Sequence, residues 1–456
     1  MNDRFNVLTL SVGLALVAFA GTAGAQSDLT PIGATRAGNK EGTIPAWEGV
    51  DQPLPGWSYG KVRGDFWKYK DEKPILVIDA SNVDKYADNL TAGQINMLKT
   101  FKGYTMPVYP SHRNCGFPDQ VVNNTKAEGG KAKIAADGWS LENAILPGVP
   151  FPAPKSGIEA IWNHLIHYSG LAADYPAGFT YVSPAPGSDK GIRVGWNQLL
   201  VYPWGDKEGA HDTKSNAGLE VGVYYTYNTP AALAGQAIVQ RYYFGADTET
   251  FYYFPGQRRV RRLPAYAYDA PLIGFENQYP ADMSFIFIGN PDRFDWKLVG
   301  KKEIYVPYNN FKTANFKANW DDMAKPGFVS ADFRRYELHR VYEVIGTVKA
   351  GVRHSAPKKT VYLDEDTWNA VVGDDYDAQG KLWKSKETGV RPFWEVNSCN
   401  SAVQWNFYDF SSGRYVVDNT VVGTGKDLRV FSDSSQDPRL KPSYFTAETL
   451  RANSER

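Results

Sequence analysis

A hairpin motif in the middle of the chain constrains the fold more than any other stretch. Residues 251–264 read Phe-Tyr-Tyr-Phe-Pro-Gly-Gln-Arg-Arg-Val-Arg-Arg-Leu-Pro, an aromatic run followed by a basic one. Pro255-Gly256 predicts a turn between two strands, because proline presets φ at the first central position and glycine accepts the positive φ that can follow. The preceding run, 238–244, is rich in β-branched and aromatic residues, which favour a pleated surface. We therefore expect a meander of three strands.

Other patterns extend this sheet through the second half of the chain. Side chains alternate in character at 219–227 and 335–344, and strand-like runs occur at 192–202, 296–306, 360–363, 402–410 and 414–417. The segment Asp377-Ala-Gln-Gly380 predicts a further hairpin turn, with Gly380 in a left-handed conformation. Sequential strands joined by short turns imply a mostly antiparallel sheet. A sheet of roughly eight strands or more is expected to curl into a barrel, a half-barrel or paired sheets.

Two helices are predicted by capping boxes, in which a hydroxyl and a Gln or Glu side chain satisfy backbone donors reciprocally. Thr91-Ala-Gly-Gln94 begins a helix of about ten residues, and Ser156-Gly-Ile-Glu159 begins a second one. The apolar face of the second helix consists of Ile158, Ile161, Trp162, Leu165 and Tyr168. His164 and His167 lie three residues apart on this helix, but no nearby residue completes a metal site, so we expect them on its polar face.

These patterns predict an α+β chain that is mainly β and forms one structural unit from residue 26 to 456. Residues 26–170 form a Pro- and Gly-rich wrap with the covering helices, and 171–420 form the curved antiparallel sheet. Residues 421–456 lose the pattern and are expected to be a surface tail with at most a short helix.

The first 25 residues have the composition of a secretory signal peptide. Arg4 precedes an apolar run at 7–20, and Ala23-Gly-Ala25 gives a small-x-small cleavage site. We expect cleavage after Ala25 and export. The apolar run is shorter than the roughly 20 residues that span a bilayer, and no later stretch approaches that length, so no transmembrane segment is expected in the mature chain.

The charge balance and the aromatic content of the chain limit the kinds of partner that we expect. Lys plus Arg and Asp plus Glu both number 50, so no global field attracts a polyanion, and nucleic acid is not an expected partner. The 28 Tyr, 23 Phe and 13 Trp suit a large sheet with much aromatic surface buried or used for contact.

Two cysteines, Cys115 and Cys399, remain in an exported and therefore oxidising setting. The simplest interpretation is one disulfide between them. Two buried free thiols, or a reactive Cys with a His partner, stay open as alternatives, since sequence alone does not show how far apart the two residues lie.

No motif with catalytic spacing is present. The patterns G-x-S-x-G, H-E-x-x-H, C-x-x-C and the P-loop are all absent. The acidic clusters Asp364-Glu-Asp366 and Asp374-Asp375 are interpreted as turns or solvated edges, because no calcium-loop spacing accompanies them. We therefore expect no catalytic residue, no metal site and no cofactor, and a protein that is not an enzyme.

The basic half of the hairpin allows two interpretations. Strand geometry puts Arg258 and Arg262 on one face and Arg259 and Arg261 on the other, so the charge is not confined to one side. The four arginines could pair with carboxylates and protect an edge strand. Alternatively, they could contact an anionic headgroup or an acidic partner, because a planar guanidinium holds phosphate bidentately.

Several stretches together carry a resemblance to a known family. They are residues 253–264, residues 285–302 with Asp295-Trp-Lys-Leu-Val-Gly300, and residues 360–366 with 377–381. They resemble the exported Gram-negative family usually labelled outer-membrane lipoprotein-sorting protein. Gly42-Thr-Ile-Pro-Ala-Trp47 and Gly157-Ile-Glu-Ala-Ile-Trp-Asn-His164 look like its long subfamily of unknown function, which often accompanies exporters of the resistance-nodulation-division type.

The resemblance implies a curved antiparallel sheet, an incomplete barrel covered by helices from the N-terminal third. This fold is similar to that of the lipoprotein carriers LolA and LolB, whose apolar cavity takes acyl chains. The protein is then expected to be a periplasmic carrier or chaperone for a lipid, a lipoprotein acyl chain or an apolar metabolite. An inner-membrane exporter or an outer-membrane protein is a candidate partner.

Aromatic side chains of the sheet are the candidate ligand contacts, because aromatics line concave apolar sites well. The residues chosen are Tyr225, Tyr242, Tyr253, Trp296 and Tyr336. One alternative is an exported carbohydrate-binding protein or hydrolase, with Asp364 and Glu365 in acid/base roles. Another is an accessory subunit of an exporter or outer-membrane system that binds only protein.

Overall fold

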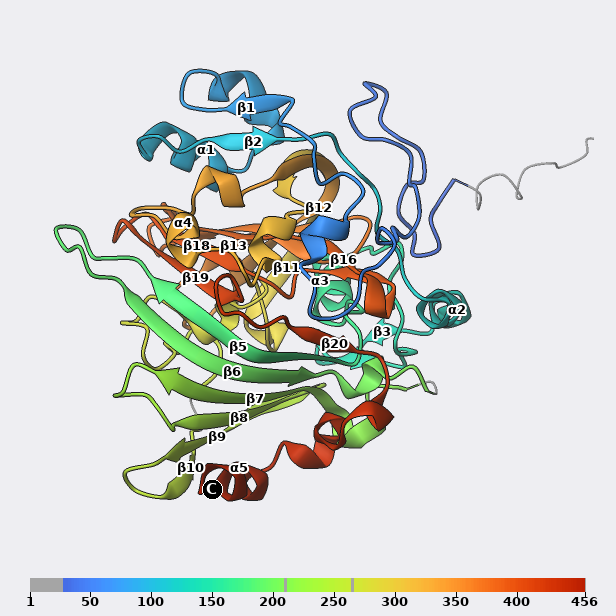
Figure 1. The fold of residues 1–456 in the computed structure, drawn as a ribbon. Helices are drawn as coiled ribbons and strands as arrows, with labels where there is room; N and C mark the ends of the chain where they lie inside the picture. Colours follow the sequence, from blue (N-terminus) through green and yellow to red (C-terminus); the bar gives the residue numbers. More distant parts are fainter. Residues whose placement is uncertain (1–27, 209–210, 264–265, 456) are drawn as a thin grey trace, which may run out of the picture.

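The computed structural model describes residues 28–208, 211–263 and 266–455. The expected signal peptide lies outside these residues. One open sheet dominates the structure, and its main strands pair antiparallel with their neighbours (Figure 1). In spatial order these strands are β11 (Phe294–Pro307), β12 (Tyr336–Val348), β13 (Lys358–Asp364), β14 (Ala370–Tyr376), β15 (Leu382–Thr388), β18 (Trp405–Asp409), β19 (Arg414–Thr420), β5 (Ala172–Val182), β6 (Ile192–Val201), β7 (Leu219–Thr229), β8 (Ala237–Tyr243), β9 (Ala246–Phe254) and β10 (Arg259–Arg262).

Shorter strands complete the sheet and form two small hairpins. β2 (Met106–Val108) pairs with β1 (Leu76–Ile78) and meets the start of β12 in parallel, and β20 (Arg429–Phe431) pairs with β5. The separate hairpins are β3 (Lys133–Ile134) with β4 (Leu141–Glu142), and β16 (Arg391–Phe393) with β17 (Ser398–Asn400). Among the described residues β10 pairs only with β9 and β11 only with β12, so the sheet is not closed into a barrel. The expected fold class, α+β and mainly β, is therefore confirmed.

Both faces of the sheet are covered. We call the face that packs against α3 (Gly157–Leu165) and the segment 266–288 the inner face. The outer face is covered by α1 (Ala92–Thr100) across β14 and β15, and by α5 (Ala447–Ser454) near β8 and β9 (Figure 1). The remaining α-helices are α2 (Asp119–Glu128) and α4 (Trp320–Met323). Because both faces of the sheet are covered, nearly every residue of β13, β14 and β19 is buried, rather than every second residue.

The capping boxes begin both predicted helices. The Thr91 hydroxyl accepts a hydrogen bond from the backbone N–H of Gln94, and the side-chain oxygen of Gln94 accepts one from the backbone N–H of Thr91. Ser156 accepts from the backbone of Glu159, but the Glu159 carboxylate bonds to the backbone of Lys155 and not to that of Ser156. The second box is thus half formed, and its helix ends at Leu165, before the expected Tyr168.

The central meander β8–β9–β10 is confirmed, but its turn differs from the prediction. Residues 255–258 form the loop, and the left-handed residue is Arg258, with φ 49°, whereas Gly256 is not left-handed. Arg258 therefore belongs to the turn and shares no strand face with Arg262. The second predicted hairpin joins β14 to β15, and its Gly380 has the expected positive φ of 73°.

The C-terminal segment contains the expected short helix, α5, but it is not a free surface tail. Leu440, Phe445 and Leu450 are 0–1 % exposed and pack on the outer face of β6–β9. Gly222 of β7 leaves room for the Phe445 ring, because a Cβ at this position would lie 2.7 Å from its Cγ. These apolar contacts fix the chain end on the sheet.

His164 of α3 is buried and His167, two residues after the end of α3, is partly buried, so the prediction that both lie on a polar helix face is wrong. His164 is 1 % exposed; its Nε2 donates to the backbone oxygen of Phe287 (3.0 Å), and its Nδ1 accepts from the backbone of Ala370 (3.2 Å). Burial lowers the pKa of His164 to about 3 and that of His167 to about 4. Neutral His164 thus joins α3 to the sheet and to the segment 266–288.

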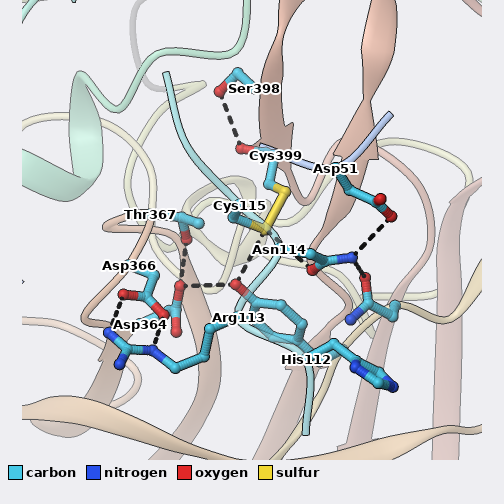
Figure 2. The surroundings of a disulfide bond; sticks show 12 residues. Asp51, His112, Arg113, Asn114, Cys115, Asp364, Asp366, Thr367, Ser398 and Cys399 are labelled. Atoms are coloured by element: carbon cyan, nitrogen blue, oxygen red, sulfur yellow. Dashed lines mark hydrogen bonds and ion pairs between the residues drawn. A yellow bond between two sulfur atoms is a disulfide. The ribbon is translucent and has the colours of Figure 1, made fainter. Parts of the chain in front are cut away.

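Cys115 and Cys399 form the predicted disulfide, with their Cα atoms 5.4 Å apart (Figure 2). The bond joins the segment after β2 to β17, across 284 positions of sequence. Trp47 of the N-terminal wrap donates from Nε1 to the backbone oxygen of Cys115 (2.7 Å), so the early wrap is held at the same place.

Candidate functional site: a tyrosine chamber under a strap

A small chamber lies on the inner face of β6, β7 and β8. Its walls combine aromatic and aliphatic side chains with a few polar groups. The lining residues are Thr180, Gln198, Val223, Tyr225, Tyr227, Ile238, Gln240, Tyr242, Tyr266, Leu272, Phe275, Tyr279, Ala281, Ser284, Trp405 and Asp418. The residues from the strands share one face because side chains alternate along a strand, as Val223, Tyr225 and Tyr227 do along β7.

Residues 266–288, which we call the strap, close the chamber. The strap connects the end of the β10 region to β11 and supplies six of the lining side chains, from Tyr266 to Ser284. It is folded on itself, since the backbone of Leu272 donates to Tyr279 (2.8 Å) and that of Ala281 donates to Ala270 (2.9 Å). The cover of the site is therefore an ordered segment with its own hydrogen bonds.

Polar contacts hold the strap to the sheet. The Tyr279 hydroxyl donates to Oδ2 of Asp418 on β19 (2.6 Å). Asp282 pairs with Lys359 (3.1 Å) and with His354 (3.0 Å); burial alone would raise the pKa of its carboxyl, but the Lys359 ammonium and the His354 hydrogen bond hold this pKa below the usual range. Lys386 donates to the backbone oxygen of Ile286 (3.0 Å). Removing one partner of such a buried contact costs free energy, because the other charged or polar group stays buried without a partner.

The strap backbone is strained. Five of its non-glycine residues have φ between 48° and 73°: Tyr268, Glu276, Asn277, Phe285 and Ile286. Asparagine tolerates this left-handed region, but a β-branched residue such as Ile286 is a true outlier there. Such conformations cost of the order of 1–3 kcal/mol each and persist only where the surroundings impose them. The contacts that anchor the strap therefore offset the free-energy cost of these strained conformations.

The chamber is too small for a lipid while the strap is closed. Its free volume is about 70 Å³. Sites for drug-sized ligands measure roughly 300–1,000 Å³, and a cavity that holds benzene measures about 150 Å³. A ligand of lipid size could enter only if the strap moved away from the inner face.

Polar atoms are placed so that they could orient a ligand. Asp418 accepts bonds from Tyr279 and Thr180, and burial raises the pKa of its carboxyl. The side-chain oxygen of Gln198 is buried and has no hydrogen-bond partner among the described residues. The chamber thus offers acceptors in an otherwise aromatic wall, which suits a ligand with an apolar body and a donor group.

The structure separates the five aromatic residues predicted to contact a ligand. Tyr225 and Tyr242 line the chamber. Tyr253 faces the outer side and packs in the cluster that includes Leu440 and Phe445. Tyr336 is covered on the outer side by the N-terminal third, where its hydroxyl lies 3.0 Å from that of Tyr104.

Trp296 lies outside the chamber, and several residues that line the chamber were not predicted from the sequence. Trp296 of β11 packs on Phe287 and donates from Nε1 to the backbone oxygen of Pro291 (2.9 Å), outside the chamber. Tyr227 could have been found, because it shares its strand face with Tyr225. The strap residues Tyr266, Phe275 and Tyr279 lie in no periodic element and gave no signal.

The four arginines lie at the end of the sheet. Arg262 pairs with Glu249 (3.1 Å), and Arg261 donates to the side chain of Gln257 (2.6 Å). Arg258 and Arg259 are exposed and have no partner among the described residues. Arg261 and Arg262 thus have side-chain partners along the edge strand, whereas Arg258 and Arg259 have none among the described residues.

The two acidic clusters were expected to be solvated, and this is wrong. All five residues, 364–366 and 374–375, are at most 4 % exposed. Asp375 pairs with Lys386 (2.8 Å), and Asp374 accepts from the backbone of Gly93 (3.0 Å). Only the turn assignment at 364–369, between β13 and β14, agrees with the structure.

A second, larger cleft of about 460 Å³ lies between the N-terminal wrap and the residues after β11. Charges of both signs line it, among them Lys70, Glu72, Lys312 and Arg335. Trp67 in its wall is only 3 % exposed and offers no free face for stacking on a sugar. The mixed charges of this cleft favour no single class of polar ligand, whereas the aromatic lining of the chamber favours an apolar ligand.

No helix within the described residues is long and apolar enough to cross a membrane. The fold and the chamber define a class of proteins with one open sheet, covered by helices and lined inside by aromatic residues. Residues 77–451 match the family described as "Protein of unknown function (DUF1329)", and the chain belongs to this family. This agrees with the expected membership of a family whose function is unknown.

Three known proteins are similar to the chain. The uncharacterized protein PA3922 of Pseudomonas aeruginosa is 36 % identical over 436 residues, which cover 93 % of this chain and 92 % of that protein. A DUF1329 family protein from Desulfovibrio piger is 15 % identical, with a TM-score of 0.39 over 62 % of this chain and 92 % of its own. A candidate outer-membrane lipoprotein-sorting domain from Vibrio parahaemolyticus is 12 % identical, with a TM-score of 0.43 over 65 % of this chain and 98 % of its own.

Proposed function

We propose that this protein is a periplasmic carrier that binds a hydrophobic molecule in the tyrosine chamber after the strap has moved. One observation carries the proposal: the aromatic inner face of an open sheet is closed by a strained strap that contains neither a strand nor an α-helix. Residues held in strained conformations cluster at sites that bind or switch. Export, expected from residues 1–25, would put the carrier outside the cytoplasm.

The chamber would bind its cargo by burial of apolar surface. Each 100 Å² removed from water contributes about 2.5 kcal/mol, so even a short acyl chain would bind. Asp418 and the free oxygen of Gln198 would select cargo that carries a donor group. Part of the binding free energy is spent on displacing the strap, which keeps affinity moderate and allows release.

Delivery requires contact with a membrane or a partner. Arg258 and Arg259, free at the tip of the β9–β10 hairpin, are placed to meet the anionic phosphates of a membrane surface. Arg261 and Arg262 would add charge to the same contact, at the cost of their present partners.

The test is native mass spectrometry of protein purified from a periplasmic extract, followed by solvent extraction of any bound mass. We expect a bound lipid or apolar metabolite, and uptake of palmitate by the emptied protein. Ile238→Phe, which fills the chamber wall, should lower palmitate uptake, whereas Val239→Ile on the outer face should not. Protein that is empty and takes up neither palmitate nor cholesterol would leave the alternatives, an accessory subunit or a sugar-binding protein.

A further inference from the structure

A second buried cluster lies beside the disulfide, away from the chamber. Asp364 is the last residue of β13 and Asp366 lies just after it, and their side chains lie next to each other near Cys115 (Figure 2). They are 1 % and 4 % exposed. His339 of the neighbouring strand β12 is also 1 % exposed, and one ligand atom from each of the three lies within 4.8 Å of the other two.

One oxygen of this cluster has no partner. Oδ2 of Asp364 accepts from the hydroxyls of Thr367 (2.7 Å) and Tyr308 (3.3 Å). Oδ1 of Asp364 is buried and makes no hydrogen bond to any described residue. It lies 4.0 Å from Nδ1 of His339, which is beyond hydrogen-bond distance. A buried, bare carboxylate oxygen is costly unless a positively charged group meets it.

The ion pairs around the cluster also leave the Asp364 carboxylate without a positively charged Arg or Lys partner among the described residues. The carboxylates of Glu337, Asp364 and Asp366 face the guanidinium groups of Arg113 and Arg335. Glu365, the remaining neighbour, pairs with Lys301 at the surface (3.4 Å). Arg113 pairs with Asp366, and Arg335 is shared by Glu337 (2.9 Å) and Glu72 (2.8 Å), so within the described chain Asp364 is the carboxylate of the cluster without an ion pair to Arg or Lys.

Each of the three residues is held by an outer partner. Nε2 of His339 lies 3.2 Å from Glu337, and the imidazole stacks on the Tyr308 ring with centroids 3.8 Å apart. Arg113 holds both oxygens of Asp366, at 2.9 and 2.7 Å, and each of these oxygens keeps a free lone pair. A carboxylate on the far nitrogen of a histidine, and hydrogen bonds on ligating carboxylates, are the usual second shell of a metal site.

We propose that His339, Asp364 and Asp366 bind a divalent transition-metal ion such as Zn²⁺ or Mn²⁺. One imidazole and two carboxylates are donors that these ions accept. Bonds of about 2.1 Å would draw the ligand atoms to roughly 3.4 Å apart, a closing of about 0.6 Å from the 4.0 Å between His339 and Asp364 and of at most about 1.4 Å for any pair of the three. The ion would tie β12 to the β13–β14 turn beside the disulfide. This site does not depend on the carrier function.

The experiment measures metal content and metal-dependent stability of the full mature chain. Protein purified without chelator is assayed by inductively coupled plasma mass spectrometry, then stripped with dipicolinate and titrated with ZnCl₂ or MnCl₂ while Tm is recorded. We expect one equivalent of bound metal, and a Tm rise of at least about 3 °C at 100-fold excess over Kd. Asp364→Asn and His339→Gln should each abolish the rise. Asp374→Asn, which changes another buried carboxylate, should keep it.

Two outcomes would overturn the proposal. In the first, wild-type protein holds no metal and its Tm does not respond to either salt, so that a proton or a water compensates Asp364. In the second, the Asp364→Asn and His339→Gln variants bind metal as tightly as wild type, which places the ion elsewhere. Should these variants fail to fold, anomalous diffraction at the zinc edge from wild-type crystals decides whether the ion lies between the three side chains.

Discussion

The hydroxyl of Tyr279 donates a 2.6 Å hydrogen bond to Oδ2 of Asp418, and this contact joins the strap to β19 behind the chamber. Both groups are buried, so the bond forms in a medium where an unpaired carboxylate is costly. The same bond blocks the one carboxylate in the chamber wall that could receive a ligand's donor group. In the proposed carrier, ligand entry and strap release would therefore be coupled at Asp418.

Tyr279→Phe should loosen the strap without changing the chamber's shape. Asp418 keeps only the Thr180 hydroxyl as a side-chain donor, and the free energy of unfolding should fall by about 1–3 kcal/mol. Palmitate should bind faster in stopped-flow fluorescence, because less free energy holds the strap closed. Tyr444→Phe, on the outer side, is the control. Equal binding rates for wild type and Tyr279→Phe would show that the strap does not gate the chamber.

Glu220 predicts a specific dependence of stability on pH. It is 3 % exposed, and burial alone raises its pKa from 4.5 to about 8. Between these values the unfolded chain loses the proton while the folded chain keeps it, so the free energy of unfolding falls as pH rises from 4.5 to 8. Glu220→Gln cannot ionise and should match wild type at low pH but exceed it by roughly 5 kcal/mol above the folded pKa.

Urea denaturation at acidic, neutral and mildly alkaline pH measures this difference. The exposed Glu208→Gln is the matched control and should follow wild type throughout. A constant offset between Glu220→Gln and wild type at all pH values would mean that Glu220 does not titrate between the two states as described.

The sheet and its hairpins could be predicted because their signals are local. Turn residues such as Gly380 and capping residues such as Thr91 act within a few positions of sequence. The chamber could be predicted only in part, because period-two alternation tells which residues share a face but not which face is inside. Tyr253 was chosen for the site, yet its neighbour Tyr252 is the one that packs toward Tyr227.

The strap and the C-terminal cover could not be predicted for another reason. Their residues pack through contacts between segments far apart in sequence, as Tyr279 does with Asp418 and Phe445 with Gly222. No periodic pattern marks such segments, because neither a strand nor a long helix carries the contacts. The burial of acidic residues such as Asp366 was misjudged for the same reason, because its arginine partner, Arg113, lies 253 positions away in the sequence.

The free arginines should contribute to membrane contact. Replacing Arg258 and Arg259 by Glu should reduce co-sedimentation with phosphatidylglycerol vesicles at least about threefold, and the effect should shrink in high salt because exposed charges are screened. Stability should stay unchanged, since neither side chain has a partner among the described residues. Lys102→Glu with Lys131→Glu makes the same charge change elsewhere. Equal losses in both double variants would indicate net charge rather than a docking site.

The C-terminal segment should stabilise the sheet that carries the chamber. Phe445 is fully buried against Gly222 of β7, so Phe445→Ala should lower the free energy of unfolding by about 3–5 kcal/mol. The outer face of β6–β9 would then be exposed, and binding of the dye ANS should rise. The exposed Lys441→Ala should change neither property. An unaltered urea midpoint for Phe445→Ala would show that the segment lies on the sheet without stabilising it.

The disulfide should hold the N-terminal wrap to the late part of the chain. Because Cys115 and Cys399 are separated by 284 positions, cross-linking them removes much chain entropy from the unfolded state. Replacing both by Ala should lower the free energy of unfolding by about 3–5 kcal/mol in urea. Dithiothreitol should destabilise the wild type to the same level and leave the double variant unchanged. Wild-type protein whose two thiols are alkylated in urea without reductant would contradict the bond.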